Sequence, residues 1–184
     1  MRGKRHSELP YPMTFLLVRA TVMVYFERDG RYLMRRYFSP EKQRNRWRCI
    51  GGVKQRFEFA VSAMKRIVEA DIGVTVTKWR YRGVIERHYE PPPSERRQHE
   101  RMYLFTVTDW EGDLDTDSPD SELRWFDKAA VAELDRWTGE RICYKALTDE
   151  MRFFMLMLDY EEDQETLIDA ALNMNRIPKE PWEV

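Results

Sequence analysis

Cysteine pairs, long apolar runs and an excess of charge of either sign are all missing from this chain. Only two cysteines occur, Cys49 and Cys143, and they do not form a Cys-x-x-Cys pair. A disulfide framework is therefore excluded, which favours a reducing compartment, and we expect a cytoplasmic protein. Arg19 interrupts the one apolar run near the N-terminus, so we expect neither a secretory signal nor a membrane span, and no membrane partner.

The motifs of several common enzyme classes are also absent. The chain has no G-x-S-x-G, no Walker loop, no G-x-G-x-x-G and no H-E-x-x-H, which argues against the chemistries that those motifs support. A net charge of −1 gives no overall attraction to nucleic acid. With 184 residues, of which 42% are hydrophobic, the chain can bury one sizeable core, and we expect one domain.

The most informative stretch spans residues 52–74. It reads Gly-x5-Glu-x7-Arg-Ile-Val-x-Ala-Asp-x-Gly-Val. If residues 59–72 form a helix, Ile67, Ala70 and Asp71 are spaced i, i+3 and i+4, so their side chains share one face. That face carries a single carboxylate, which is the bare minimum for Mg²⁺ even when phosphates and waters complete its octahedron.

The same stretch resembles the box of the Nudix (MutT-like) hydrolases, whose pattern is Gly-x5-Glu-x7-Arg-Glu-U-x-Glu-Glu-x-Gly-U, with U an aliphatic residue. Six positions fit that pattern: Gly52, Glu58, Arg66, Val68, Gly73 and Val74. Where the family places its three helical glutamates, this chain has Ile67, Ala70 and Asp71. The resemblance therefore covers the framework of the box and only one of its three helical acids.

In the family that the box resembles, the first glutamate and the arginine brace the loop against the helix, and the later glutamates bind metal. The resemblance implies that Glu58 and Arg66 form this bracing pair. If the protein is active, it also implies that Asp71 helps to hold Mg²⁺ or Mn²⁺. A glutamate outside the box often completes such a site, and Glu100 and Glu122 are the candidates here. Our candidate catalytic residues are Glu58, Arg66 and Asp71, and our candidate metal ligands are Asp71, Glu58, Glu100 and Glu122.

The flanking sequence predicts strands on both sides of the box. Residues 14–27 are rich in β-branched and aromatic residues and precede Asp29-Gly30, a strong hairpin signal. We predict strands at 14–27, 31–37, 47–50, 74–89, 101–108 and 122–126, a helix at 59–72 and a helix at about 127–135. This order is what the resemblance implies, an α/β fold in which an α/β/α sandwich surrounds a mixed sheet.

The last part of the chain is predicted to be helical. Met151, Phe154, Met155 and Leu158 are spaced i, i+3, i+4 and i+7, and the segment 163–175 carries a second apolar set. These spacings predict helices that pack on the domain or form a homodimer interface. We accordingly divide the chain into a flexible N-terminal segment (1–13), a Nudix-like domain (14–140), C-terminal helices (141–177) and a tail (178–184).

Cations are concentrated in and just before the box. The candidate phosphate-binding residues are Arg46, Arg48, Lys54 and Arg56, which could form charge-assisted hydrogen bonds with a phosphorylated ligand. Trp47, Phe57 and Tyr103 are candidates to stack on a base. Because one Nudix-like protein with a degenerate box binds RNA, RNA is a possible partner beside a nucleotide or another phosphate-bearing small molecule.

Three functions are open at this point. The first is recognition of a nucleotide or other diphosphate-containing ligand, with metal-dependent pyrophosphohydrolase activity weak or lost. The second is an active hydrolase of nucleoside diphosphates linked to X, with rearranged Mg²⁺ ligands. The third is a protein-interaction module that uses the C-terminal helices, and it predicts that a chain truncated after about residue 145 still folds.

Overall fold

The computed structural model describes residues 17–39, 44–89, 98–116, 122–134, 138–149, 151–163 and 165–178. The predicted N-terminal segment 1–13 and most of the predicted tail lie outside these residues. The elements are β1 (Leu17–Arg28), β2 (Arg31–Ser39), β3 (Arg44–Arg48), β4 (Ile50–Val53), α1 (Ala60–Ile72), β5 (Thr75–Tyr89), β6 (Gln98–Glu111), β7 (Leu123–Asp127), α2 (Lys128–Ala132), α3 (Thr138–Thr148), β8 (Phe154–Tyr160), β9 (Leu167–Leu172) and β10 (Asn175–Arg176).

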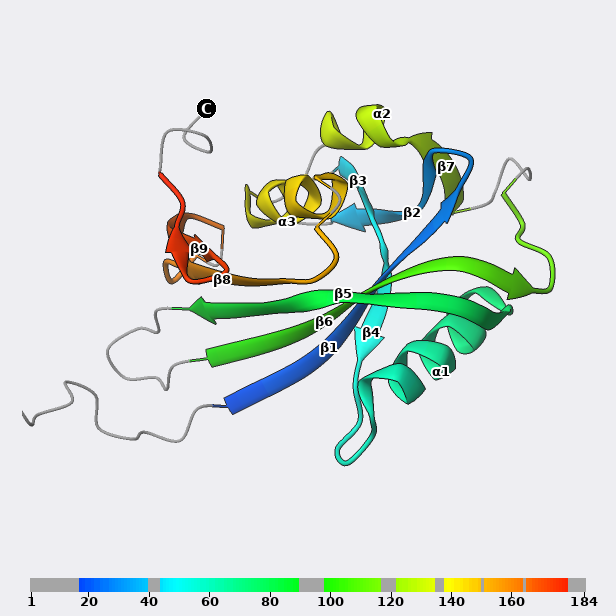
Figure 1. The fold of residues 1–184 in the computed structure, drawn as a ribbon, viewed down its shortest axis with the longest axis horizontal. Coiled ribbons are helices and arrows are strands. Elements are labelled where there is room, and N and C mark those ends of the chain that lie inside the picture. Colours follow the sequence, from blue (N-terminus) through cyan, green and yellow to red (C-terminus); the bar gives the residue numbers. More distant parts are fainter. Residues whose placement is uncertain are drawn as a thin grey trace, which may run out of the picture.

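The strands form one mixed sheet in the order β10-β9-β8-β5-β6-β1-β2-β3, with β4 paired to β1 and β7 paired to β2. The β1–β6 and β5–β8 pairs are parallel, and the other pairs are antiparallel. Helix α1 lies on one face of this sheet, and α2 and α3 lie on the other (Figure 1). The predicted α/β fold with a mixed sheet between helices is therefore confirmed.

The β1–β2 hairpin shows why this sheet begins where the sequence predicts. Asp29 and Gly30 both have positive φ angles, 50° and 72°, as a two-residue hairpin loop requires. Along β1, Val22, Val24 and Phe26 face α1, while the side chains between them face α3. Strand β1 thus contributes to the core on both sides.

The core consists of two clusters, one on each face of the sheet. Beneath α1, the buried residues Ala63, Met64, Ile67 and Val68 recur at helical spacing and pack on the strands. Full burial of one large apolar side chain contributes about 1.5–3 kcal/mol, so this face holds α1 in place. The helix ends at Gly73, whose left-handed φ of 73° lets its N–H donate to the carbonyl of Glu69 at 3.0 Å.

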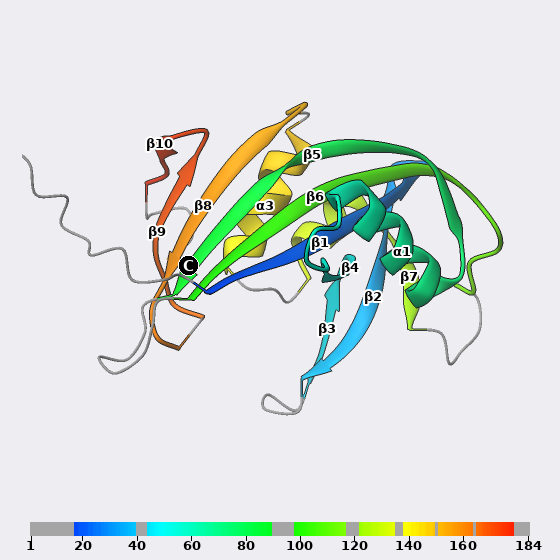
Figure 2. The same cartoon turned by 90° about the horizontal axis from the view of Figure 1, so that it is seen from below.

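The short strand predicted at 47–50 is two strands in the structure. Strand β3 ends at Arg48 and pairs with β2, whereas β4 begins at Ile50 and pairs with β1. Gly51 and Gly52, just past the predicted strand, belong to β4. Figure 2 shows β4 between β1 and the β2–β3 pair, close to α1.

The predicted C-terminal helices are wrong after residue 150. Residues 154–160 form β8, which pairs with β5, and residues 167–172 form β9. Along β8, Phe154, Leu156, Leu158 and Tyr160 are buried, and the residues between them are more exposed. The apolar run satisfies both a period of two and the i, i+3, i+4, i+7 spacing, so periodicity alone could not distinguish a strand from a helix. Pairing with β5 decides in favour of the strand.

Within the described residues, no helix is both long and apolar enough to span a membrane.

Candidate functional site

The entry into the box helix is built on two glycines, of which Gly51 leaves no room for a side chain. A Cβ at Gly51 would lie 2.5 Å from the carbonyl oxygen of Val22, closer than real Cβ contacts come. A Cβ at Gly52 would lie 3.4 Å from the side chain of Ile67 on α1. The backbone of β4 therefore lies directly between β1 and the box helix.

The loop after β4 is fixed by the predicted Glu58–Arg66 pair. Arg66 Nε and Nη2 each donate to one oxygen of Glu58 at 2.8 Å, and Nη2 also donates to the carbonyl of Val53 at 3.2 Å. The N–H of Gln55 donates to Glu58 Oε2 at 2.9 Å, and Lys54 Nζ donates to two loop carbonyls at 2.8 and 3.0 Å. The bonded Arg66 guanidinium lowers the pKa of Glu58 to about 2. The loop is thus a rigid bracket, as the resemblance implies.

The helical face that would carry three glutamates in the family has a different role here. Ile67 is only 7% exposed and belongs to the core beneath α1, and Ala70 is exposed with no polar group. Asp71 forms an ion pair with Arg35 of β2. The same guanidinium donates from Nη2 to Glu122 at 3.1 Å and from Nε to the same oxygen at 3.2 Å. A guanidinium therefore joins the two carboxylates.

Sequence reasoning did not find Arg35. It lies 36 residues from Asp71 and 87 from Glu122 along the chain. The pairing of β2 with β7 and the docking of α1 bring the three together. The only signal in the sequence was that Arg35 opens the cationic stretch.

Glu100, the other predicted metal ligand outside the box, forms different contacts. It accepts a hydrogen bond from Thr21 at 3.2 Å and lies 3.7 Å from Arg87 and 4.0 Å from Arg19. It belongs to β6, beside β1 and β5. Its contacts therefore stabilise the sheet.

The residues present do not fit a divalent metal ion. The four predicted ligands are divided among the Glu58–Arg66 pair, the Arg35 bridge and the Glu100 contacts. Among the residues that the structure describes, no group of three or more His, Cys, Asp and Glu side chains is placed to hold a metal ion. Mg²⁺ needs hard oxygen ligands, and each of these carboxylates already neutralises a cation.

Two of the predicted phosphate-binding arginines share a sheet face with Arg35. In the β2–β3 register Arg35 is opposite Arg48, and Tyr37 is opposite Arg46, so all four side chains lie on the face that α1 covers. Arg48 is exposed, with its guanidinium 4.4 Å from the ring centre of Tyr37. Arg46 is only 4% exposed, so its role as a phosphate ligand stays a prediction that its burial does not favour.

The two predicted phosphate-binding residues of the loop also differ from each other. Lys54 Nζ is engaged with the loop carbonyls, so its first role is structural. Arg56 is exposed, and its guanidinium lies 4.8 Å from the ring centre of Phe57. Arg48 and Arg56 are thus the two predicted cations that solvent reaches freely.

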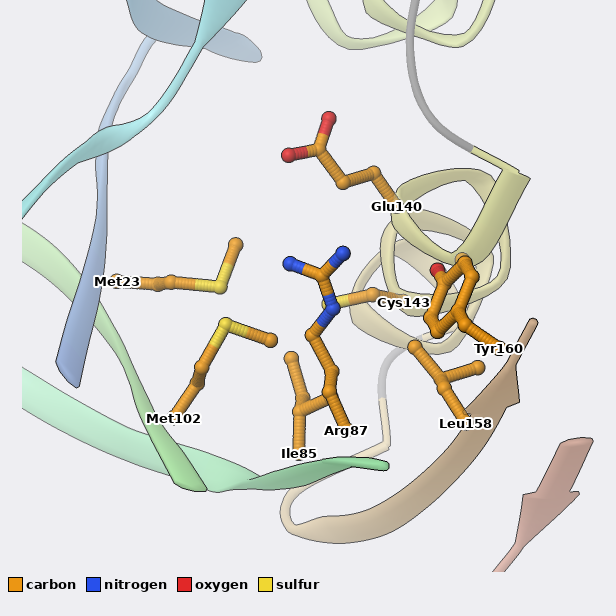
Figure 3. Close-up of a pocket in the computed structure, with 9 residues that line it drawn as sticks. Met23, Ile85, Arg87, Met102, Glu140, Cys143, Leu158 and Tyr160 are labelled. Atoms are coloured by element: carbon orange, nitrogen blue, oxygen red, sulfur yellow. The ribbon is translucent and has the colours of Figure 1, made fainter. Parts of the chain in front are cut away.

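A small cleft with an enclosed volume of about 20 Å³ opens on the α3 face of the sheet. It is lined by Met23, Ile85, Arg87, Met102, Gly139, Glu140, Cys143, Leu158 and Tyr160. Figure 3 shows the Arg87 guanidinium in the middle, between the two methionines and Glu140. The buried Nε of Arg87 has no hydrogen-bond acceptor in the protein. Five separate segments build the cleft, so no local pattern could have predicted it.

The cleft begins next to the box. Met23 of the cleft is the register partner of Gly51, and Gly52 contacts α1. The two neighbouring residues of β4 therefore lie on opposite faces of the sheet, Gly51 beside the cleft and Gly52 beside α1.

Comparison of the fold with solved structures gives MutT proteins among the similar chains. A MutT protein of Bacillus halodurans has a TM-score of 0.70 and 20% identity, over 84% of this chain and 97% of that one. The ORF135 protein of E. coli has a TM-score of 0.60 and 19% identity, over 76% and 94%. A hydrolase of ADP compounds has a TM-score of 0.53 and 14% identity, over 71% of each chain. At these identities the likeness concerns the fold.

A search of the curated proteins gave no match. The sequence model of the NUDIX domain family matches residues 16–147, from the start of β1 to the end of α3. This region contains the glycine pair, the Glu58–Arg66 bracket and the box helix. The chain therefore belongs to the NUDIX domain family.

Proposed function

We propose that the protein binds a nucleotide or another diphosphate-containing ligand through cationic side chains, and that its metal-dependent pyrophosphohydrolase activity is weak or lost. The observation that carries this proposal is the Arg35 bridge between Asp71 and Glu122. A cation of the protein itself takes the place beside these carboxylates that a divalent ion would need.

The charge balance of the α1 face favours metal-free binding. Ile67 and Ala70 bring no negative charge, and the charge of Asp71 is compensated by Arg35. The neighbouring Arg48 offsets the second carboxylate of the bridge, Glu122, and presents an exposed guanidinium that suits a phosphate without a bridging metal. A guanidinium offers paired N–H groups that match two phosphate oxygens.

The mouth of the cleft, on the opposite face of the sheet from Arg35 and Arg48, offers a separate set of contacts for an organic group. Apolar walls with a few polar groups are typical of ligand sites, and Met23 and Met102 provide adaptable walls around Arg87 and Glu140. Glu140 can accept hydrogen bonds and Arg87 can donate them, which suits a heterocycle with both kinds of group. Structural neighbours named as MutT proteins and as an ADP-compound hydrolase agree with a ligand of this class.

Titration calorimetry with ADP tests the proposal. We expect ADP to bind equally well with EDTA and with Mg²⁺, and Arg48→Gln to weaken binding about 10- to 150-fold, because one charge-assisted hydrogen bond contributes roughly 1.5–3 kcal/mol. Arg176→Gln is the matched control, since Arg176 is an exposed arginine of β10 bonded to Asp169. It should leave the affinity unchanged.

The alternative of an active hydrolase predicts the opposite results. In that case chelation would abolish ADP binding, and phosphate release with Mg²⁺ or Mn²⁺ would be robust and lost in Asp71→Ala. Either result would remove the proposed metal-free mode. A phosphate-release screen over nucleotides, nucleotide sugars and caps gives the same decision when the substrate is not ADP.

A further inference from the structure

The loop between β4 and α1 presents two aromatic rings to solvent. We call residues 53–59 the aromatic loop. Phe57 is 89% exposed and Phe59 is 82% exposed, and Val53 beside them is 50% exposed. In Figure 1 this loop projects past the end of α1, away from the body of the molecule. Rings this exposed contribute little to the core.

Phe57 also adopts a backbone conformation that disfavours its own side chain. Its φ of 64° is in the left-handed region, where glycine is the usual residue. The Glu58–Arg66 bracket on one side and the Lys54 contacts on the other hold the loop in this shape. The ring is therefore presented in a fixed position, which lowers the entropy lost on binding a partner.

Of the three aromatic side chains that the sequence offered for stacking, only Phe57 is this accessible. Trp47 packs edge-on against Phe126 with ring centres 4.9 Å apart. Tyr103 packs against Tyr81 at 6.5 Å. Phe57 instead has the guanidinium of Arg56 at 4.8 Å from its ring centre. A flat ring and an anionic group of one partner can thus be bound at the same place, by Phe57 and Arg56.

The charge around the aromatic loop identifies the partner as an anion. The sequence from Arg35 to Phe57 holds eight Lys and Arg residues and a single acid, Glu41. In the described part of that stretch, Arg48 and Arg56 are exposed, and Glu58 is neutralised by Arg66. Two exposed cations suit neighbouring phosphates of a strand, and aromatic rings suit bases because every base has a flat face. An acidic peptide would use the cations but leave the rings unmatched.

We propose that the aromatic loop binds single-stranded nucleic acid, with a base stacked on Phe57 and backbone phosphates contacted by Arg56 and Arg48. The inference rests on the proposed function, because the nucleotide bound at the box would be one unit of the strand. The aromatic loop adds a second contact point, which the binding of a mononucleotide does not need.

The Phe57→Gly variant tests this role without harming the fold, because glycine removes the ring and also relieves the left-handed backbone. We expect fluorescence anisotropy with a labelled oligouridylate to show binding about 5- to 100-fold weaker than that of the wild-type chain, as for loss of one stacked base. The melting temperature should not fall. The matched control is Met174→Gly, because Met174 is 93% exposed, has a φ of 67° and lies in the β9–β10 hairpin. It should bind like wild type.

Several outcomes would overturn the inference. One is wild-type affinity in Phe57→Gly, and another is equal loss in Met174→Gly. Equal affinity of the wild-type chain for poly-glutamate of matched charge would assign the loop to acidic chains in general. ADP titration separates the two proposals: if ADP binds but oligouridylate does not, only the aromatic-loop inference fails, and if ADP itself does not bind, the proposed function fails.

Discussion

Putting the two missing carboxylates back into the box helix should convert this chain into a metal binder. The double substitution Ile67→Glu/Ala70→Glu places acids at i, i+3 and i+4 with Asp71. Three carboxylates should then outcompete the single guanidinium of Arg35 for Asp71 and offer Mn²⁺ a hard-oxygen site. The wild-type chain lacks those oxygens and should not respond to the metal.

The loss of stability expected from this double substitution follows from the burial of Ile67. This side chain is 7% exposed and packs against Gly52, so its loss costs about 3 kcal/mol, within the usual range for a buried isoleucine. For a chain of this length, 1 kcal/mol corresponds to about 2–4 °C, which predicts a melting temperature about 6–12 °C lower in EDTA. Mn²⁺ at about 100 times its dissociation constant should restore about 2.7 kcal/mol of the free energy of unfolding, which raises the melting temperature by about 5–11 °C.

Differential scanning fluorimetry in EDTA and in Mn²⁺ measures both quantities. The control is Ile67→Gln/Ala70→Gln, which has the same shape without the charge and should lose the same stability without recovering it. A melting temperature of the wild-type chain that rises with Mn²⁺ would refute the reasoning. An acidic variant that behaves like the glutamine variant would refute it equally.

Two further predictions concern stability. The pKa of Glu58 is about 2, below its ordinary value of 4.5, so its bond to Arg66 stabilises the fold above that ordinary value and is lost as the pH falls toward 2. Urea midpoints of Glu58→Gln and wild type should therefore differ most at neutral pH and converge in acid, and a difference that grows in acid would contradict this sign. Deletion of residues 150–184 should give an insoluble or unfolded chain, measured by expression and circular dichroism, because it removes β8 and its buried Phe154. A cooperative melt of the truncated chain would restore the interaction-module interpretation.

The box was predictable because its residues satisfy several local rules together. Gly73 marks the end of a helix, the glycines before it mark the entry, and the apolar residues between them recur at helical spacing. The predicted helix 59–72 accordingly differs from Ala60–Ile72 by one residue. The Glu58–Arg66 contact followed from the resemblance.

The features that the sequence missed depend on contacts between distant segments. The bridge formed by Arg35 needs the register of β2 with β7, and the cleft around Arg87 needs β1, β5, β6, β8 and α3 in place. The failure over residues 154–160 has a different cause, since this mostly apolar run satisfies both the helical spacing and a period of two. Residue patterns therefore located the box but not its surroundings.

The parallel pairing of β8 with β5 has a consequence for how the protein is made. Until Phe154–Tyr160 has left the ribosome, the edge of β5 that pairs with β8 has unpaired backbone amides and carbonyls. The side chains that β8 covers remain exposed to water during this time. Synthesis of the whole box is by then long complete. The nascent chain consequently passes through an interval in which it can join a neighbouring chain by strand pairing, and chaperone occupancy should peak in that interval.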